Sequence, residues 1–264
     1  MFPFIRHQTE AYDEGAHRIG GIPVKQTPHY GIDAPNVIRN LLLIGILCLA
    51  TSAALFSFVD RSKIIWLILI GWVFIVGISL VLTAILMIFS SKFGKIKERE
   101  RILDMLSIKG DEHILDVGCG KGLYLIGAAK RLTNGKAVGI DIWQSEDLSG
   151  NEMENTLQNA KLEGVIDKVS IETADMRKMP FENHTFDVVL SSFAIHNIYD
   201  RVEREKALKE IIRVLKPGGK LCIIDFQHID EYLKFLEEQG IMGIHRFKTK
   251  LIFPPATVIT GNKG

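Results

Sequence analysis

The stretch from residue 113 to residue 122 combines an acid with closely spaced glycines. It reads His-Ile-Leu-Asp-Val-Gly-Cys-Gly-Lys-Gly, so an apolar strand runs into Asp116 and glycines follow at positions 118, 120 and 122. A strand, a glycine turn and a helix are the layout of a nucleotide-binding crevice. A dinucleotide fingerprint, however, spaces its glycines G-x-G-x-x-G around a pyrophosphate. The G-x-G-x-G spacing here, with an acid two residues before the first glycine, favours a ligand with a positively charged end.

The elements that position these residues follow from the hydrophobic pattern after residue 111. Strand-like and helix-like segments alternate, which is typical of a parallel sheet with helices on both faces. Asp200 followed by Glu203 resembles a helix capping box, and the run 216–219 (Lys-Pro-Gly-Gly) stops that helix. Strands are expected at 113–117, 136–142, 168–173, 186–191, 219–225, 243–247 and 256–260, and helices at 122–132, 151–162, 201–215 and 229–239.

Four blocks occur in a specific order along this part of the chain. They are Asp116–Gly122, Ala137–Trp143, Ala174–Met176 and Phe186–Asn197. With these blocks, residues 113–225 resemble a class I S-adenosylmethionine-dependent methyltransferase, most closely the small UbiE-like, or type 11, branch. The resemblance implies an α/β, Rossmann-like methyltransferase fold, with a mostly parallel seven-stranded sheet and helices on both faces. It also implies S-adenosyl-L-methionine as the cofactor, whose amine and sulfonium carry positive charge.

The resemblance assigns the first block to the methionine portion of the cofactor. Asp116 is expected to contact the amino end. The backbone around Gly118, Cys119, Gly120 and Gly122 is expected to approach the ligand closely, which glycine permits because it has no Cβ. A lone glycine triplet has a structural alternative, a tight turn.

The second and third blocks are expected to hold the adenosine. Asp141 ends a strand, where an acid can accept hydrogen bonds from both ribose hydroxyls. Ile142 and Trp143 are expected to form an apolar wall for the adenine. By the resemblance, Asp175 accepts from the adenine amino group and Met176 packs on the ring. The alternatives are a helix N-cap acid for Asp141 and a turn-forming acid for Asp175.

The fourth block is expected to face the methyl donor. Its strand ends at Ser191, which is expected to contact the cofactor, and the following loop carries His196 and Asn197 where related enzymes place substrate-contacting residues. Histidine is the side chain best suited to take a proton near neutral pH, so His196 is a candidate general base. A structural role is its alternative. His113, His184 and His228 are expected to be structural.

Two long apolar runs precede the methyltransferase-like part. Leu41–Val59 has 19 residues and Ile64–Phe89 has 26 residues without a charge. Each exceeds the ~18 residues that indicate a membrane-spanning helix. Only residues 60–63 separate them, so a transmembrane helical hairpin is expected over 37–89. Two such runs are hard to bury as core helices in a small domain, and the 40 residues before them argue against a cleaved signal peptide.

The positive charges around the hairpin predict its orientation. Lys92, Lys95, Lys97, Arg99 and Arg101 follow it, Arg18, Lys25 and Arg39 precede it, and only Arg61 and Lys63 lie in the connecting loop. The positive-inside rule therefore places both termini, and the methyltransferase-like domain, in the cytoplasm.

The remaining segments complete four expected regions. Residues 1–36 are expected to be a loosely ordered cytoplasmic tail, which could alternatively fold over the active site as a lid through His29 and Tyr30. Residues 90–110 are expected to form a basic juxtamembrane helix, which topology alone explains, although its basic residues could touch anionic headgroups. Residues 111–264 are expected to form the cofactor-binding domain.

Composition narrows the function classes. A net charge of +1 provides no large basic field, so nucleic acid is not expected as a partner. The three cysteines, Cys48, Cys119 and Cys222, have no spacing typical of a metal clip or a disulfide framework. No metal site is expected.

The sequence therefore predicts a membrane-anchored methyltransferase that acts on a small or lipid-like acceptor. Methyl transfer from a sulfonium mainly requires an aligned acceptor, so no obligatory catalytic constellation is needed. A membrane-anchored sensor or scaffold that binds the cofactor without turnover is the alternative. A nucleotide-sugar or NAD enzyme is disfavoured by the glycine spacing. The hairpin fits both an anchor and a route for the substrate.

Overall fold

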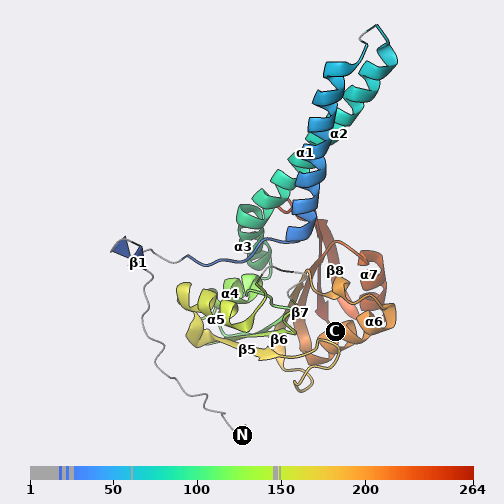
Figure 1. Cartoon of the computed structure of the whole chain (residues 1–264). Helices are drawn as coiled ribbons and strands as arrows, with labels where there is room; N and C mark the ends of the chain where they lie inside the picture. Colours follow the sequence, from blue (N-terminus) through green and yellow to red (C-terminus); the bar gives the residue numbers. More distant parts are fainter. Residues whose placement is uncertain (1–17, 20–21, 24–26, 61, 145–147, 149) are drawn as a thin grey trace.

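The computed structural model describes residues 18–19, 22–23, 27–60, 62–144, 148 and 150–264. Figure 1 shows two parts, a helical hairpin that projects away and an α/β part that contains the sheet. The hairpin consists of α1 (Pro35–Phe58) and α2 (Ile64–Phe89). Before it, Arg18–Ile19 and Ile22–Pro23 pair as the short antiparallel strands β1 and β2.

The α/β part contains the seven-stranded sheet that the alternating pattern predicted. Its order is β5-β4-β3-β6-β7-β9-β8. Neighbours from β5 to β7 pair in parallel, whereas β9 is antiparallel to both of its neighbours. The strands are β3 (His113–Val117), β4 (Lys136–Asp141), β5 (Val169–Thr173), β6 (Phe186–Ser192), β7 (Leu215–Asp225), β8 (Ile241–Lys248) and β9 (Thr257–Lys263).

The direction in which strands are added reverses between β3 and β6. The chain adds β4 and β5 on one side of β3, then returns to place β6 and β7 on the other side. In open α/β sheets, ligands bind outside the carboxyl ends of the strands at such a switch point. The topology therefore indicates a ligand site at the turns that follow β3 and β6.

Helices cover both faces of the sheet, and β3 shows why. Successive side chains of a strand point to opposite faces, so Ile114 joins one hydrophobic cluster and Leu115 the other. Helices α3 (Lys95–Met105), α4 (Leu123–Ala129) and α5 (Met153–Leu162) contribute to the first cluster. Helices α6 (Arg201–Val214) and α7 (Ile229–Glu238) contribute to the second. Asp200 caps α6 by accepting from the amide of Glu203 at 3.0 Å, as predicted.

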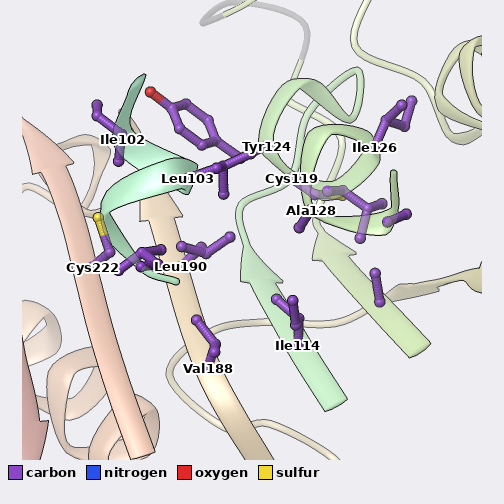
Figure 2. Packing of buried hydrophobic residues seen from close by; sticks show 14 of the residues in the cluster. Ile102, Leu103, Ile114, Cys119, Tyr124, Ile126, Ala128, Val188, Leu190 and Cys222 are labelled. Atoms are coloured by element: carbon purple, nitrogen blue, oxygen red, sulfur yellow. The ribbon is translucent and has the colours of Figure 1, made fainter. Parts of the chain in front are cut away.

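Helix α3 belongs to the core of the α/β part. Ile102 and Leu103 are fully buried beside Tyr124 of α4, and Cys222 of β7 lies in the same cluster (Figure 2). Helix α2 runs into α3 through a π-helical turn, η1 (Ser90–Gly94). The hairpin is therefore joined to the sheet by continuous helical backbone and not by a flexible linker.

Only some of the basic residues around this helix face outward. Lys92 and Lys97 are exposed, but Lys95 and Arg99 are buried. Lys95 Nζ donates to the carbonyls of Tyr30 and Gly31 at 2.8 and 2.9 Å. Arg99 also donates to the Tyr30 hydroxyl, so two of the five basic residues bind the chain's own N-terminal segment.

Residues 29–33 lie against the α/β part, which a loosely ordered tail does not predict. The His29 amide donates to Asn159 Oδ1, and the Tyr30 hydroxyl donates to Glu163 Oε1, both at 2.9 Å. Asp33 forms a β-bridge with Leu148. The rest of the expected tail, at 1–17, 20–21 and 24–26, lies outside the described residues.

The hairpin helices pack on each other and present apolar side chains outward. A Cβ added at Gly45 would lie 3.1 Å from the Gly77 carbonyl oxygen, so the small residues allow a close approach. Outward-facing side chains include Leu47, Trp72 and Ile75, each more than half exposed. Both helices are long and apolar enough to cross a membrane.

Candidate active site

A cavity of about 1190 Å³ opens at the carboxyl edge of the sheet, beside the switch point. Residues from all four sequence blocks line it, and it continues to the base of the hairpin. Ligand pockets usually have volumes of about 300–1,000 Å³, so this space exceeds what one small ligand needs. The predicted residues on its wall are Asp116, Gly118, Cys119, Gly120, Asp141, Ile142, Trp143, Asp175, Met176 and His196.

Asp116 presents an unsatisfied carboxylate oxygen at the cavity. The side chain is 2% exposed, and Oδ2 accepts from the Leu125 amide at 2.8 Å. Oδ1 has no partner among the described residues. Burial raises the pKa of Asp116 to about 7, opposed by the Leu125 hydrogen bond and reinforced by nearby Asp141. A cationic N–H donor would satisfy the oxygen and offset this cost.

The glycine turn is compact because side chains are excluded from it. Gly118 has φ +72°, and a Cβ there would lie 2.2 Å from the Cβ of Ala194 in the loop after β6. Gly120 has φ +49° and donates its amide to Asp141 Oδ2 at 2.8 Å. These two glycines bring the turns after β3, β4 and β6 together. Burial raises the pKa of the Cys119 thiol, which favours its neutral form.

Asp141 organises the next part of the wall. Besides Gly120, its carboxylate accepts from the Trp143 amide at 2.7 Å and from Asn151 Nδ2 at 3.3 Å. The Trp143 indole donates to Thr173 Oγ1 at 2.8 Å, which fixes the ring at the end of β5. The acid and the apolar wall expected beside it are thus held together.

Asp175 lies on the cavity wall, but its carboxylate is engaged by Arg177. Arg177 Nε lies 3.0 and 2.9 Å from the two carboxylate oxygens. These hydrogen bonds hold the pKa of Asp175 below its ordinary value. A contact with an adenine amino group would therefore share a carboxylate that Arg177 already binds.

His196 forms a pair with an acid that the sequence analysis did not single out. Its Nδ1 lies 2.8 Å from Oδ1 of Asp225, and its amide donates to Oδ2 at 3.2 Å. Asp225 is 1% exposed at the end of β7. The His196 ring packs against Phe226, with centroids 4.5 Å apart. This contact is an ion-pair distance and not a hydrogen bond, since Nδ1 has no hydrogen-bond partner among the described residues. A carboxylate this close to the ring would stabilise an imidazolium.

Two of the predicted residues, Ser191 and Gly122, do not line the cavity. Ser191 is 1% exposed, and its hydroxyl donates to the Val117 carbonyl at 3.0 Å, while Ser192 is the residue on the cavity wall. The expectation for Ser191 is wrong because successive side chains of β6 face opposite sides. Gly122 precedes α4 with φ +81°, and a Cβ there would lie 2.8 Å from Thr156. Gly122 therefore allows α4 and α5 to pack and does not line the cavity.

Asp225 and Asn151 are the main polar residues that the motifs missed. The position of Asp225, at the carboxyl end of a predicted parallel strand, was a usable signal. Asn151 carried no such signal, because its contact with Asp141 depends on how the loop before α5 folds.

Comparison with known proteins agrees with the fold. Residues 115–223 match a family model described as "Methyltransferase domain". A sterol 4-C-methyltransferase of Caenorhabditis elegans is 36% identical over 133 residues, 50% of this chain and 36% of that protein. The ubiquinone/menaquinone biosynthesis C-methyltransferase UbiE of Roseobacter denitrificans is 30% identical over 131 residues, 50% of this chain and 49% of that protein. The chain thus spans half or less of the length of these curated relatives.

Among solved structures, geranyl diphosphate C-methyltransferase from Streptomyces coelicolor A3(2) has the same fold. The two superpose with a TM-score of 0.52 and 15% identity, covering 64% of this chain and 76% of that chain. That protein was solved with S-adenosyl-L-homocysteine bound. The likeness confirms the expected Rossmann-like sheet.

Proposed function

Because the chain carries a class I S-adenosylmethionine-dependent methyltransferase domain, we propose that it methylates a small, lipophilic acceptor at a membrane surface. One observation carries this proposal: His196, with Asp225 beside it, lines the same cavity as Asp116 and its unsatisfied oxygen. The first suits proton removal from an acceptor, and the second suits the ammonium end of the cofactor. The two together favour turnover over binding alone.

The residues of the cavity fit S-adenosylmethionine. Asp116 Oδ1 is free to accept from its amino group, and the turn at Gly118 and Gly120 leaves space for a closely approaching ligand. Asp141 and the Trp143–Ile142 wall suit a ribose and an adenine. When bound, the cofactor supplies an electrophilic methyl group on a positively charged sulfur.

His196 acts as the general base in this mechanism. With Asp225 beside the ring, the His196 imidazole takes the proton of a phenolic or enolic hydroxyl, and the electron pair released makes the conjugated carbon of that acceptor nucleophilic. Bound S-adenosylmethionine would supply the methyl group to this carbon and would be left as neutral S-adenosylhomocysteine. Asp225 stabilises the imidazolium. Methylation of carbon is proposed because several similar proteins are C-methyltransferases.

The hairpin supports the membrane part of the proposal. Only 11% of the apolar window of each helix is buried, so these helices are unlike the buried core helices of a soluble domain. An outward-facing apolar surface of this length requires lipid or a partner. The positive-inside pattern supports a topology with both termini and the cavity on the cytoplasmic side.

The test is methyl transfer by the full chain in lipid nanodiscs. We expect methyl-labelled S-adenosylmethionine to transfer label into an organic-extractable fraction of a total lipid extract. His196→Ala should lower the rate by about 10²–10⁴-fold, the usual contribution of a general base, with unchanged S-adenosylhomocysteine affinity by calorimetry. His113→Ala, at the exposed start of β3, is the matched control.

Two outcomes would contradict the proposal. Tight S-adenosylhomocysteine binding without label transfer to any lipid or soluble acceptor would favour the sensor function. Tight binding of NAD in place of S-adenosylhomocysteine would exclude a methyltransferase.

A further inference from the structure

We infer that the base of the hairpin forms one wall of the acceptor site, and that the acceptor is a membrane amphiphile that enters between α1 and the loop before β9. This inference rests on the proposed function and adds the binding site of its substrate. In this arrangement the hairpin is part of the binding site as well as an anchor.

The cavity reaches the hairpin through three segments that are distant in sequence. They are the first turn of α1, the junction of α2 with η1, and the loop between β8 and β9; Figure 1 shows the hairpin base and α3 above the sheet. Their lining residues are Ala34, Val37, Met87, Ser90, Ile252 and Phe253. His196 lines the same cavity, so a ligand can extend without interruption from the His196 side chain to the hairpin.

The chemistry of the wall changes along this path. The cofactor end has the carboxylates of Asp116, Asp141 and Asp175, whereas the hairpin end has mainly apolar and uncharged side chains. Among the described residues that line this end, Lys95 and Asp33 form an ion pair at 2.9 Å. A molecule with a hydroxyl at one end and a hydrocarbon tail at the other matches this change.

The hairpin end is open toward the side where lipid would lie. Val37 is 49% exposed and Phe253 is 36% exposed although both line the cavity. Phe89 and Phe93, more than half exposed, follow on the adjoining helix with ring centroids 5.4 Å apart. This is also where the apolar stretch of α2 ends and exposed Lys92 begins the basic flank. The opening thus coincides with the expected boundary between hydrocarbon and headgroups.

Polar contacts fix this wall in place. Ser90 Oγ accepts from the Phe253 amide at 2.8 Å, and Ser91 Oγ donates to Asp33 at 3.1 Å. Gly94 allows the close approach of the loop, since a Cβ there would lie 1.9 Å from the Leu251 carbonyl oxygen. Both sides of the opening are therefore attached to the same helical turn, which defines a preformed site.

The test uses a photoactivatable amphiphile that requires no turnover. The probe is 4-dodecylphenol with a diazirine at the end of its alkyl chain, added to the full chain in nanodiscs and mapped by mass spectrometry. We expect crosslinks on peptides that contain the hairpin base. Val37→Trp and Met87→Trp should each lower this crosslinking at least about tenfold by filling the opening, with unchanged S-adenosylhomocysteine affinity. Label transfer to lipid should fall in parallel.

Matched controls place the same side chain on the outer surface of the same helices. Leu43 and Ile85 are 60% and 51% exposed and do not line the cavity, so Leu43→Trp and Ile85→Trp should behave as the parent chain. The inference would be overturned if the Val37→Trp and Met87→Trp variants crosslinked as strongly as the parent chain. It would also be overturned if phenol without an alkyl tail displaced the probe. Crosslinking at the hairpin base without methyl transfer would instead contradict only the proposed function.

Discussion

The two halves of the cavity are built in different ways. The cofactor half consists of turns that directly follow β3, β4 and β5, each within a short motif. The acceptor half combines the start of α1, the end of α2 and the loop before β9, which come from opposite ends of the chain. The comparison teaches that the cofactor half depends on local backbone geometry, whereas the acceptor half depends on how the hairpin is docked.

The halves also differ in their charge. Acids dominate the cofactor half, where Asp116 has an unpaired oxygen. In the acceptor half Asp33 is paired with Lys95, and Asp225 lies behind the cavity wall beside His196. Changes in the first half should therefore alter cofactor affinity, and changes in the second should alter turnover. Two substitutions and a change of pH separate these effects.

The largest effect is expected from Asp225→Asn at the acceptor side. An amide lacks the negative charge that stabilises the imidazolium, so kcat should fall by about 10²–10⁴-fold while S-adenosylhomocysteine affinity is retained. This split between kcat and cofactor affinity separates a positioning role from a loss of folding. Asp230→Asn, whose side chain is 93% exposed, is the control. An equal loss of cofactor affinity and kcat would contradict a positioning role for Asp225.

A smaller effect, confined to the cofactor half, is expected from Gly118→Ala. The new Cβ meets Ala194 at 2.2 Å and must adopt a φ of +72°. Strain and overpacking of this kind cost about 1–3 kcal/mol each, so cofactor affinity should fall by about 100-fold in calorimetry.

Two variants isolate the cause of the Gly118 effect. Gly164→Ala has a similar φ of +71° but open space around its Cβ, so it should leave affinity unchanged. Adding Ala194→Gly to Gly118→Ala should restore part of the affinity. Full affinity in Gly118→Ala would contradict the proposed close approach of the cofactor to this turn.

The smallest effect concerns pH. Asp116 has a pKa raised to about 7, so below that pH the free protein carries it protonated. A cationic amino group binds the carboxylate form, so S-adenosylhomocysteine affinity should fall by up to about tenfold per unit as the pH drops below about 7. Affinity above about pH 7 should level off. Asp116→Asn should bind weakly and without this dependence, and a flat profile from about pH 5.5 to about pH 7 in the parent chain would contradict the assignment.

The sheet and most of the cofactor half were predictable because their signals are local. Strand 113–117 was predicted with the boundaries that β3 has, and Asp116, Gly118 and Asp141 lie on the cavity as expected. Each depends on a strand and the turn that follows it. Ser191 was misplaced by one residue, and in a strand one residue reverses the face.

The acceptor half was not predictable from such signals. Lys95 was expected among the topology charges, yet it is 5% exposed and binds the carbonyls of residues 30 and 31. Tyr30, only 6% exposed, was proposed as part of a lid, and it contacts Glu163 on the α/β part. These contacts join residues more than 60 positions apart, which neither periodicity nor motif spacing reports.

The continuous helix from α2 through η1 into α3 has a consequence for how substrates are found. Ile102 and Leu103, in the α3 part of this helix, are buried in the core of the α/β part. Because helical backbone continues through η1, no flexible linker separates the cavity from the hairpin. In a bilayer, its mouth would stay at one depth, and acceptors would reach it by lateral diffusion within a single leaflet. The encounter rate would then scale with the mole fraction of acceptor in the lipid and not with its concentration in the surrounding water.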